Sequence, residues 1–104
     1  MLSLRSELEK IIHSIEINYH PEKIILYGSL AAGRETEGSD IDILVVKDTD
    51  KDPWSRSTEV DRFIDHQAPV DVLVYTSREI EERLKMRDFF IKDILENGKV
   101  VYEK

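Results

Sequence analysis

Two aspartates separated by one residue, Asp40 and Asp42, begin an apolar run that continues to Val46. Such a run is typical of a β-strand, and because a strand alternates its faces residue by residue, both carboxylates point to the same side. Like charges placed side by side repel each other, and folding alone gives no reason to put them there. A divalent cation makes such a pair favourable, and hard oxygen ligands of this kind suit Mg²⁺.

A glycine and a serine, Gly28 and Ser29, end an earlier apolar run, and ten residues separate Ser29 from Asp40. The glycine can supply a tight backbone turn, and the serine can place a hydroxyl where phosphates bind. Mg²⁺ carries the charge between carboxylates and phosphates. The spacing therefore predicts a site for a metal ion together with a phosphate group.

A third aspartate, Asp71, interrupts the apolar run 70–75, where a carboxylate is costly to bury without a partner. If this run is a strand beside the one that carries Asp40 and Asp42, the three carboxylates converge on one patch. Three converging carboxylates can hold two metal ions, roughly 3.5–4 Å apart, and activate a hydroxyl for in-line attack on phosphorus.

Hydrophobic periodicity and capping residues predict the elements that must position these aspartates. Strands are predicted at 23–27, 40–47, 70–75 and 99–103, and helices at 3–18, from Pro53 to about His66, and from 77 to Gly98 with a break near Arg87. One or two helical turns are expected at 29–33, and Trp54, Val60, Phe63 and Ile64 are expected to face inward. The order predicts an α/β (α+β) fold, a small mixed β-sheet with helices packed against it, in one domain spanning 1–104.

Charge and composition exclude several classes of function. The 104 residues include 22 Asp and Glu against 15 Lys and Arg, a net charge of −7, and no cysteine. General nucleic-acid binding needs a basic stripe, and none is present in the sequence; binding to anionic membranes is disfavoured for the same reason. Disulfides and thiolate metal sites are excluded. Without a signal-peptide pattern or a long apolar run, a cytoplasmic setting is expected.

Together, the Gly28-Ser29 turn, the Asp40-Ile41-Asp42 pair and Asp71 resemble the DNA polymerase beta-type nucleotidyltransferase superfamily. Within it, the chain is similar to the minimal nucleotidyltransferases that are often encoded beside a HEPN-domain protein. The resemblance extends from the strand at 23–27 to the ending at 97–103 and implies a polymerase beta-like fold. The spacing match is more specific than a lone glycine-rich loop.

The resemblance implies a role for each matching residue. Gly28 and Ser29 would hold the triphosphate of ATP, Asp40 and Asp42 would ligate both Mg²⁺ ions, and Asp71 would ligate the catalytic ion and help to deprotonate the acceptor. AMP would pass to a hydroxyl and pyrophosphate would leave. In members paired with HEPN-domain toxins the acceptor is a tyrosine of the toxin, so the resemblance implies that this protein is an antitoxin.

The phosphate-binding half of the motif departs from many relatives, which continue Gly-Ser with Arg-Ala-Arg-Gly. Here Leu30 and Ala32 stand at the two arginine positions, so Arg34 is the neighbouring candidate for a phosphate contact. The departure favours, as an alternative, a non-catalytic antitoxin or scaffold that binds its HEPN-type partner by contact alone. A transferase acting on a small molecule is a further alternative.

Simpler interpretations remain for each feature. Asp40 and Asp42 could mark a solvated strand end, Asp71 could be a cap or face solvent on an edge strand, and Gly28 and Ser29 could be a turn glycine and a cap. The three histidines are scattered without metal-ligand spacing. Three large aromatic residues are expected in the core, or one of them in a partner interface; they are Trp54, Phe89 and Phe90.

Overall fold

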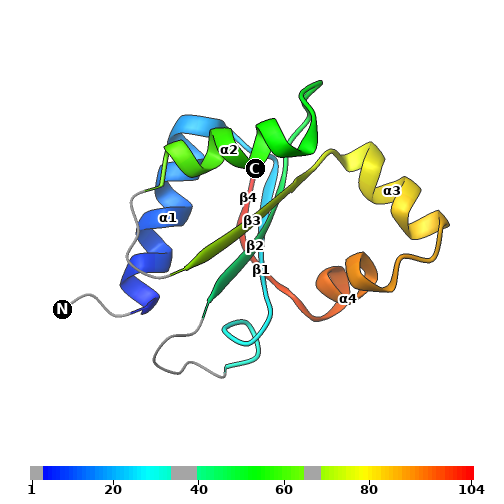
Figure 1. The fold of residues 1–104 in the computed structure, drawn as a ribbon. Helices are drawn as coiled ribbons and strands as arrows, with labels where there is room; N and C mark the ends of the chain where they lie inside the picture. The colour runs from blue at the N-terminus through cyan, green and yellow to red at the C-terminus, as the bar shows by residue number, and fades with distance from the viewer. Residues whose placement is uncertain (1–3, 34–39, 65–68) are drawn as a thin grey trace.

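The computed structural model describes residues 4–33, 40–64 and 69–104, which form a four-stranded sheet with helices on both faces (Figure 1). In chain order the elements are α1 (Leu4–Tyr19), β1 (Lys23–Tyr27), β2 (Ile41–Val46), α2 (Pro53–Arg62), β3 (Val70–Tyr75), α3 (Ser77–Lys85), α4 (Phe89–Asn97) and β4 (Lys99–Glu103). One prediction, the phosphate contact of Arg34, falls outside the described residues.

The sheet has the strand order β3-β2-β1-β4, with β1 antiparallel to β2 and β4, and β2 parallel to β3. The predicted mixed sheet is therefore confirmed. The central strand β2 is buried along almost its whole length, which agrees with its nearly continuous apolar sequence. Because β2 lies between β1 and β3, residues from all three strands meet at its ends.

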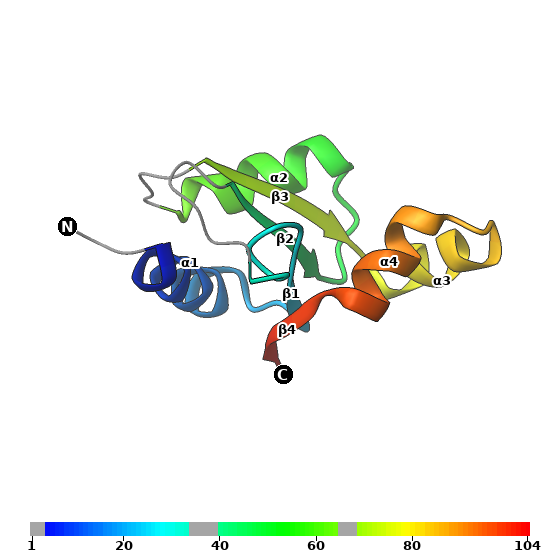
Figure 2. The same cartoon turned by 90° about the horizontal axis from the view of Figure 1, so that it is seen from below.

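The larger core lies between the sheet and the helices α1 and α2, which cover one face (Figures 1 and 2). Apolar residues recur every three or four positions along α1, so they form one stripe that faces the sheet. The strands contribute alternate residues to this core, as their period of two requires. The core includes Leu8, Ile11, Ile15, Ile24, Leu26, Ile43, Val45 and Val60.

A smaller core lies on the opposite face, where Ile91 and Ile94 of α4 pack against Ile25 and Leu44. Gly98 follows α4 directly and brings it close to β1. A Cβ added to Gly98 would lie 2.7 Å from Ile25 Cγ2 and 3.1 Å from the Leu26 carbonyl oxygen. Helix α4 is thus held against the strand that leads to Gly28.

The helix boundaries follow local capping chemistry, as predicted. The Asp52 side chain accepts from the Ser55 backbone N–H at 2.9 Å at the start of α2, and Thr76 with Glu79 forms the predicted capping box of α3. The predicted break is at Arg87, whose φ of 59° separates α3 from α4. Helix α2 ends earlier than predicted, at Arg62.

The expectation that Trp54 faces inward is wrong: this side chain is 81% exposed. The residues of α2 that are buried are Arg56 and Val60. Because a helix turns by roughly 100° per residue, Trp54 lies roughly 200° around the helix from Arg56 and faces away from the sheet. Apolar character alone does not reveal which face of a short helix meets the core.

Buried Arg56 joins α2 to β3 and α3. Its guanidinium donates to the Val74 carbonyl oxygen at 3.3 Å and forms an ion pair with Glu79 Oε1 at 2.6 Å. Burial raises the pKa of Glu79, but the bonds from Arg56 and Thr76 outweigh it, so the pKa of Glu79 is lowered overall. Ser57 Oγ donates to the Val72 carbonyl oxygen at 3.1 Å. Side chains of α2 therefore cover the outer edge of β3.

None of the helices within 4–33, 40–64 and 69–104 is long and apolar enough to cross a membrane.

Candidate active site

Three side chains form a row across the sheet where β1 ends and where β2 and β3 begin. Tyr27 pairs with Asp42 across the antiparallel β1–β2 ladder, and Asp42 pairs with Asp71 across the parallel β2–β3 ladder. Residues paired in this way project from the same face of the sheet. The strands therefore bring Asp42 and Asp71 together, as the sequence predicted.

The row lies on the face that carries α4. Ile25 stands two residues before Tyr27, Leu44 stands two residues after Asp42, and both belong to the smaller core beneath α4. Since a strand repeats its face every two residues, Tyr27 and Asp42 point to that side as well. The site is thus bounded below by the sheet and at one side by α4.

The carboxylates repel each other in this arrangement. Burial raises the pKa of Asp42, and the charge of Asp71, a hydrogen bond with Asp71 and the charge of Asp40 raise it further. Asp40 directly precedes β2 and is exposed. A divalent cation between these carboxylates would offset the repulsion and lower the pKa of Asp42 again.

The donor set fits a hard cation, because it consists of carboxylate oxygens. Asp42 and Asp71 lie directly side by side, and Asp40 is close enough to influence Asp42. Within the part of the chain that the structure describes, no three acidic, histidine or cysteine side chains are already placed to share one ion. The metal-ligand roles of Asp40, Asp42 and Asp71 therefore stay a prediction.

Gly28 lies against the Asp42 carboxylate, and this contact explains why glycine stands there. Its φ is +78°, a left-handed conformation that side chains disfavour, and an added Cβ would lie 2.5 Å from Asp42 Oδ2. The chain then makes a single turn, in which the Ala32 N–H donates to the Gly28 carbonyl oxygen at 3.2 Å. The turn predicted at Gly28 therefore lies next to the carboxylate of Asp42.

A cleft of about 360 Å³ opens beside this turn. Tyr27, Gly28, Ser29 and Ala32 line one side. The other side is formed by the end of α4 and the residue that follows it, which contribute Asp93, Asn97 and Gly98. The cleft joins the predicted phosphate-binding turn to a helix that sequence reasoning did not connect with it.

Tyr27 is the residue of the row that sequence reasoning missed. Burial raises the pKa of Tyr27 to about 12, with smaller contributions from the charges of Asp42, Asp71 and Tyr75. The phenol therefore stays protonated near neutral pH and presents a neutral hydrogen-bond donor. Its ring packs edge-on against Phe90 of α4, with centroids 5.8 Å apart. Its position directly before Gly28 was the available signal.

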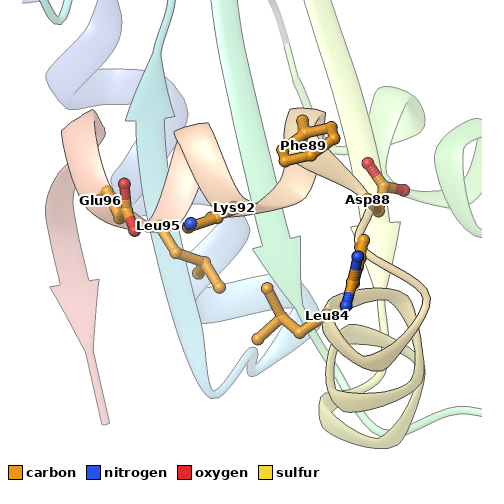
Figure 3. Close-up of a pocket in the computed structure, with 7 residues that line it drawn as sticks. Leu84, Asp88, Phe89, Lys92, Leu95 and Glu96 are labelled. Atoms are coloured by element: carbon orange, nitrogen blue, oxygen red, sulfur yellow. Dashed lines mark ion pairs between the residues drawn. The ribbon is translucent and has the colours of Figure 1, made fainter.

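A larger groove of about 640 Å³ lies between α3 and α4 (Figure 3). Leu84 of α3 and Leu95 of α4 face the space between the two helices. The other lining residues are Arg87, Asp88, Phe89, Lys92 and Glu96. Neither the Gly28-Ser29 turn nor any aspartate of the predicted site lines this groove, so its size does not make it the place of the chemistry.

Comparison with known proteins identifies the class of this fold and site. Residues 9–104 match the family described as "Polymerase beta, Nucleotidyltransferase", and the chain belongs to this family. The protein is therefore an enzyme of the nucleotidyltransferase class, and both the resemblance and the polymerase beta-like fold are confirmed. Members of the family generally use a nucleoside triphosphate and a divalent metal.

Two individual proteins are similar over nearly the whole chain. A "putative protein adenylyltransferase" of Methanocaldococcus jannaschii is 33% identical over 97 residues, which cover 91% of this chain and 94% of that protein. The crystal structure of a "putative nucleotidyltransferase" of Sulfolobus solfataricus has a TM-score of 0.59 and 24% identity, and the match covers 97% of this chain and 86% of that one. The second similarity shows the same fold.

Proposed function

We propose that this protein transfers AMP from ATP to a hydroxyl of another protein, with Mg²⁺ as the metal. The observation that carries the proposal is the contact between the Gly28 backbone and Asp42, which in turn lies in register with Asp71. This arrangement joins a phosphate-binding turn to a pair of carboxylates. The name of the M. jannaschii relative supports a protein as the acceptor.

Each residue of the site has a role in this transfer. Asp40, Asp42 and Asp71 would hold the metal ions, which neutralise charge on the phosphates and activate the attacking hydroxyl. Gly28 and Ser29 would hold the triphosphate. The acceptor oxygen forms a bond to the α-phosphorus while the bond to pyrophosphate breaks, and Asp71 accepts the hydroxyl proton.

The acceptor in this proposal is a tyrosine of a HEPN-domain toxin, and its modification would make the protein an antitoxin. Large apolar side chains on the surface support binding to a protein, because such groups are favourable in an interface. Trp54 is 81% exposed and Phe89 is 74% exposed. The acceptor class rests on the family resemblance and on the name of the relative.

The direct test combines the protein, Mg²⁺ and ATP labelled at the α-phosphate with the HEPN-domain protein encoded beside it. We expect label on the HEPN-domain protein, and loss of labelling in Asp42→Asn, Asp71→Asn and excess EDTA. Asp48→Asn removes an exposed carboxylate outside the site and serves as the matched control. Absence of transfer, with Asp42→Asn behaving like wild type, would refute the enzymatic proposal.

A second candidate is an antitoxin that neutralises its partner by contact alone. It is favoured by the composition of the cleft, where no Lys or Arg is among the described lining residues and Ala32 takes a position that carries arginine in many relatives. Calorimetry separates the candidates, because a contact antitoxin need not bind Mg²⁺-ATP. Partner binding that is unchanged in Asp42→Asn, without measurable ATP binding by wild type, would favour this candidate.

A further inference from the structure

The α4 wall of the cleft carries a carboxylate and an amide that are bonded to each other. Asn97 Nδ2 donates to Asp93 Oδ1 at 2.7 Å, and the two residues are one helical turn apart. This bond orients the carboxylate and engages one of its two oxygens. Both side chains are exposed, and among the described residues Oδ2 of Asp93 has no hydrogen-bond partner, so a ligand in the cleft can reach it.

The two walls of the cleft differ in the groups that they offer. The turn at Gly28 and Ser29 contributes glycine backbone and a serine hydroxyl, and a hydroxyl can donate a hydrogen bond to a phosphate oxygen. The carboxylate of Asp93 repels phosphate and instead accepts hydrogen bonds from neutral hydroxyls. A nucleoside triphosphate lying across the cleft would therefore place its phosphates at the turn and its sugar at α4.

The position of this wall is built into the fold. Gly98 allows the end of α4 to approach β1, and the edge-on contact between Phe90 and Tyr27 joins the same helix to the row of site residues. Tyr27 lines the cleft between the two walls. Asp93 is consequently held on a helix that is packed against the sheet, rather than on a loop.

We propose that Asp93, oriented by Asn97, binds the ribose hydroxyls of the nucleoside triphosphate. This inference rests on the proposed function and deepens it by assigning the sugar-binding end of the site. Carboxylates bind ribose hydroxyls in dinucleotide sites of a different fold, which shows that the chemistry is suitable. Asp93 is a specificity residue in this arrangement, and Asn97 is a positioning residue.

Calorimetry in excess Mg²⁺ tests the assignment with three probes: ATP, 2′,3′-dideoxyATP and inorganic tripolyphosphate. We expect wild type to bind ATP about tenfold more tightly than the dideoxy compound, the size of one hydrogen bond to a charged group. Asp93→Asn should abolish this preference and leave the affinity for tripolyphosphate unchanged. Asn97→Ala should reduce the preference, with no further loss when added to Asp93→Asn.

Glu96→Gln is the matched control, because it removes a carboxylate from the same helix. Glu96 lines the groove between α3 and α4 and pairs with Lys92 at 3.9 Å, so it lies outside the cleft. This variant should keep the preference of wild type for ATP. Equal changes in Glu96→Gln and Asp93→Asn would show a general effect of charge and would overturn the assignment.

The tripolyphosphate probe distinguishes failure of this inference from failure of the proposed function. If tripolyphosphate binds wild type and not Asp42→Asn, the phosphate and metal half of the site is intact. Equal binding of ATP and dideoxyATP by wild type would then overturn only the role of Asp93. If tripolyphosphate and ATP both fail to bind wild type, the proposed function and the sugar site are both overturned.

Discussion

Replacing Gly28 with alanine tests the contact that joins the turn to the carboxylates. The new Cβ would lie 2.5 Å from Asp42 Oδ2, so the carboxylate must retreat by about 1 Å to regain an ordinary contact. Displacement of a reacting group by about 1 Å can cost roughly 10²-fold in rate. We therefore expect Gly28→Ala to lower nucleotidyl transfer by about 10²-fold.

Gly33 offers a matched control for the cost of placing alanine at a positive φ. Its φ is also +78°, but an added Cβ would meet no atom of the described residues within 4 Å. Alanine in this conformation costs about 1–2 kcal/mol at either position, which corresponds to roughly 5–15 °C in Tm for a domain of this size. The two variants should thus lose comparable stability and differ in activity.

Thermal unfolding followed by circular dichroism would measure the shared backbone cost, and transfer of labelled AMP would measure the effect on Asp42. Binding of Mn²⁺ supplies a second readout that does not depend on the acceptor, and it should weaken in Gly28→Ala alone. If both variants transfer AMP within threefold of each other, the Gly28–Asp42 contact does not position the reacting groups, and the reasoning is refuted.

Three further outcomes are expected. Glu79→Gln should lower the free energy of unfolding in urea by about 1–2 kcal/mol at neutral pH, because Arg56 loses its charged partner. Since the pKa of Glu79 is lowered in the folded protein, the ion pair stabilises wild type fully at pH values above the ordinary pKa of glutamate, and this stabilisation is lost as the pH falls through the lowered pKa. A difference in unfolding free energy between wild type and Glu79→Gln that persists below the lowered pKa would contradict the ion pair. Ala32→Arg should tighten Mg²⁺-ATP binding in calorimetry by about tenfold, since it places a cation in the cleft. Leu30→Arg should instead lower the unfolding free energy by about 2 kcal/mol or more, because Leu30 packs against the larger core. Trp54→Ser should change the unfolding free energy by less than about 0.5 kcal/mol, and a larger loss would show that the exposed ring contributes to stability.

Local patterns predicted most of the elements correctly. The strands at 23–27, 70–75 and 99–103 match the structure at both ends, and the capping residues Asp52 and Thr76 begin helices as expected. These features depend on neighbours within a few residues, where side-chain periodicity and capping bonds are decided. The inward orientation of Trp54 failed because it depends on which face of α2 meets the sheet.

Burial of Arg56 also lay beyond sequence reasoning. A charged residue in a short polar helix is expected to face solvent. Here the carbonyl oxygen of Val74 and the carboxylate of Glu79 satisfy the guanidinium, and both come from later elements. The partners of a buried charge can be recognised only once the elements are packed together.

The amino-acid sequence by itself determined the chemistry that is available: a glycine turn, a hydroxyl and three carboxylates at a spacing specific enough to identify the family. Tertiary structure alone decided the register that pairs Asp42 with Asp71, the contact of Gly28 with Asp42, and the wall formed by Asp93 and Asn97. The physical reason is the range of the interactions. Turns and caps are specified by adjacent residues. The pairing of Asp42 with Asp71 instead joins positions about 30 residues apart, and the packing of α4 and β4 on β1 joins segments about 70 residues apart in the chain.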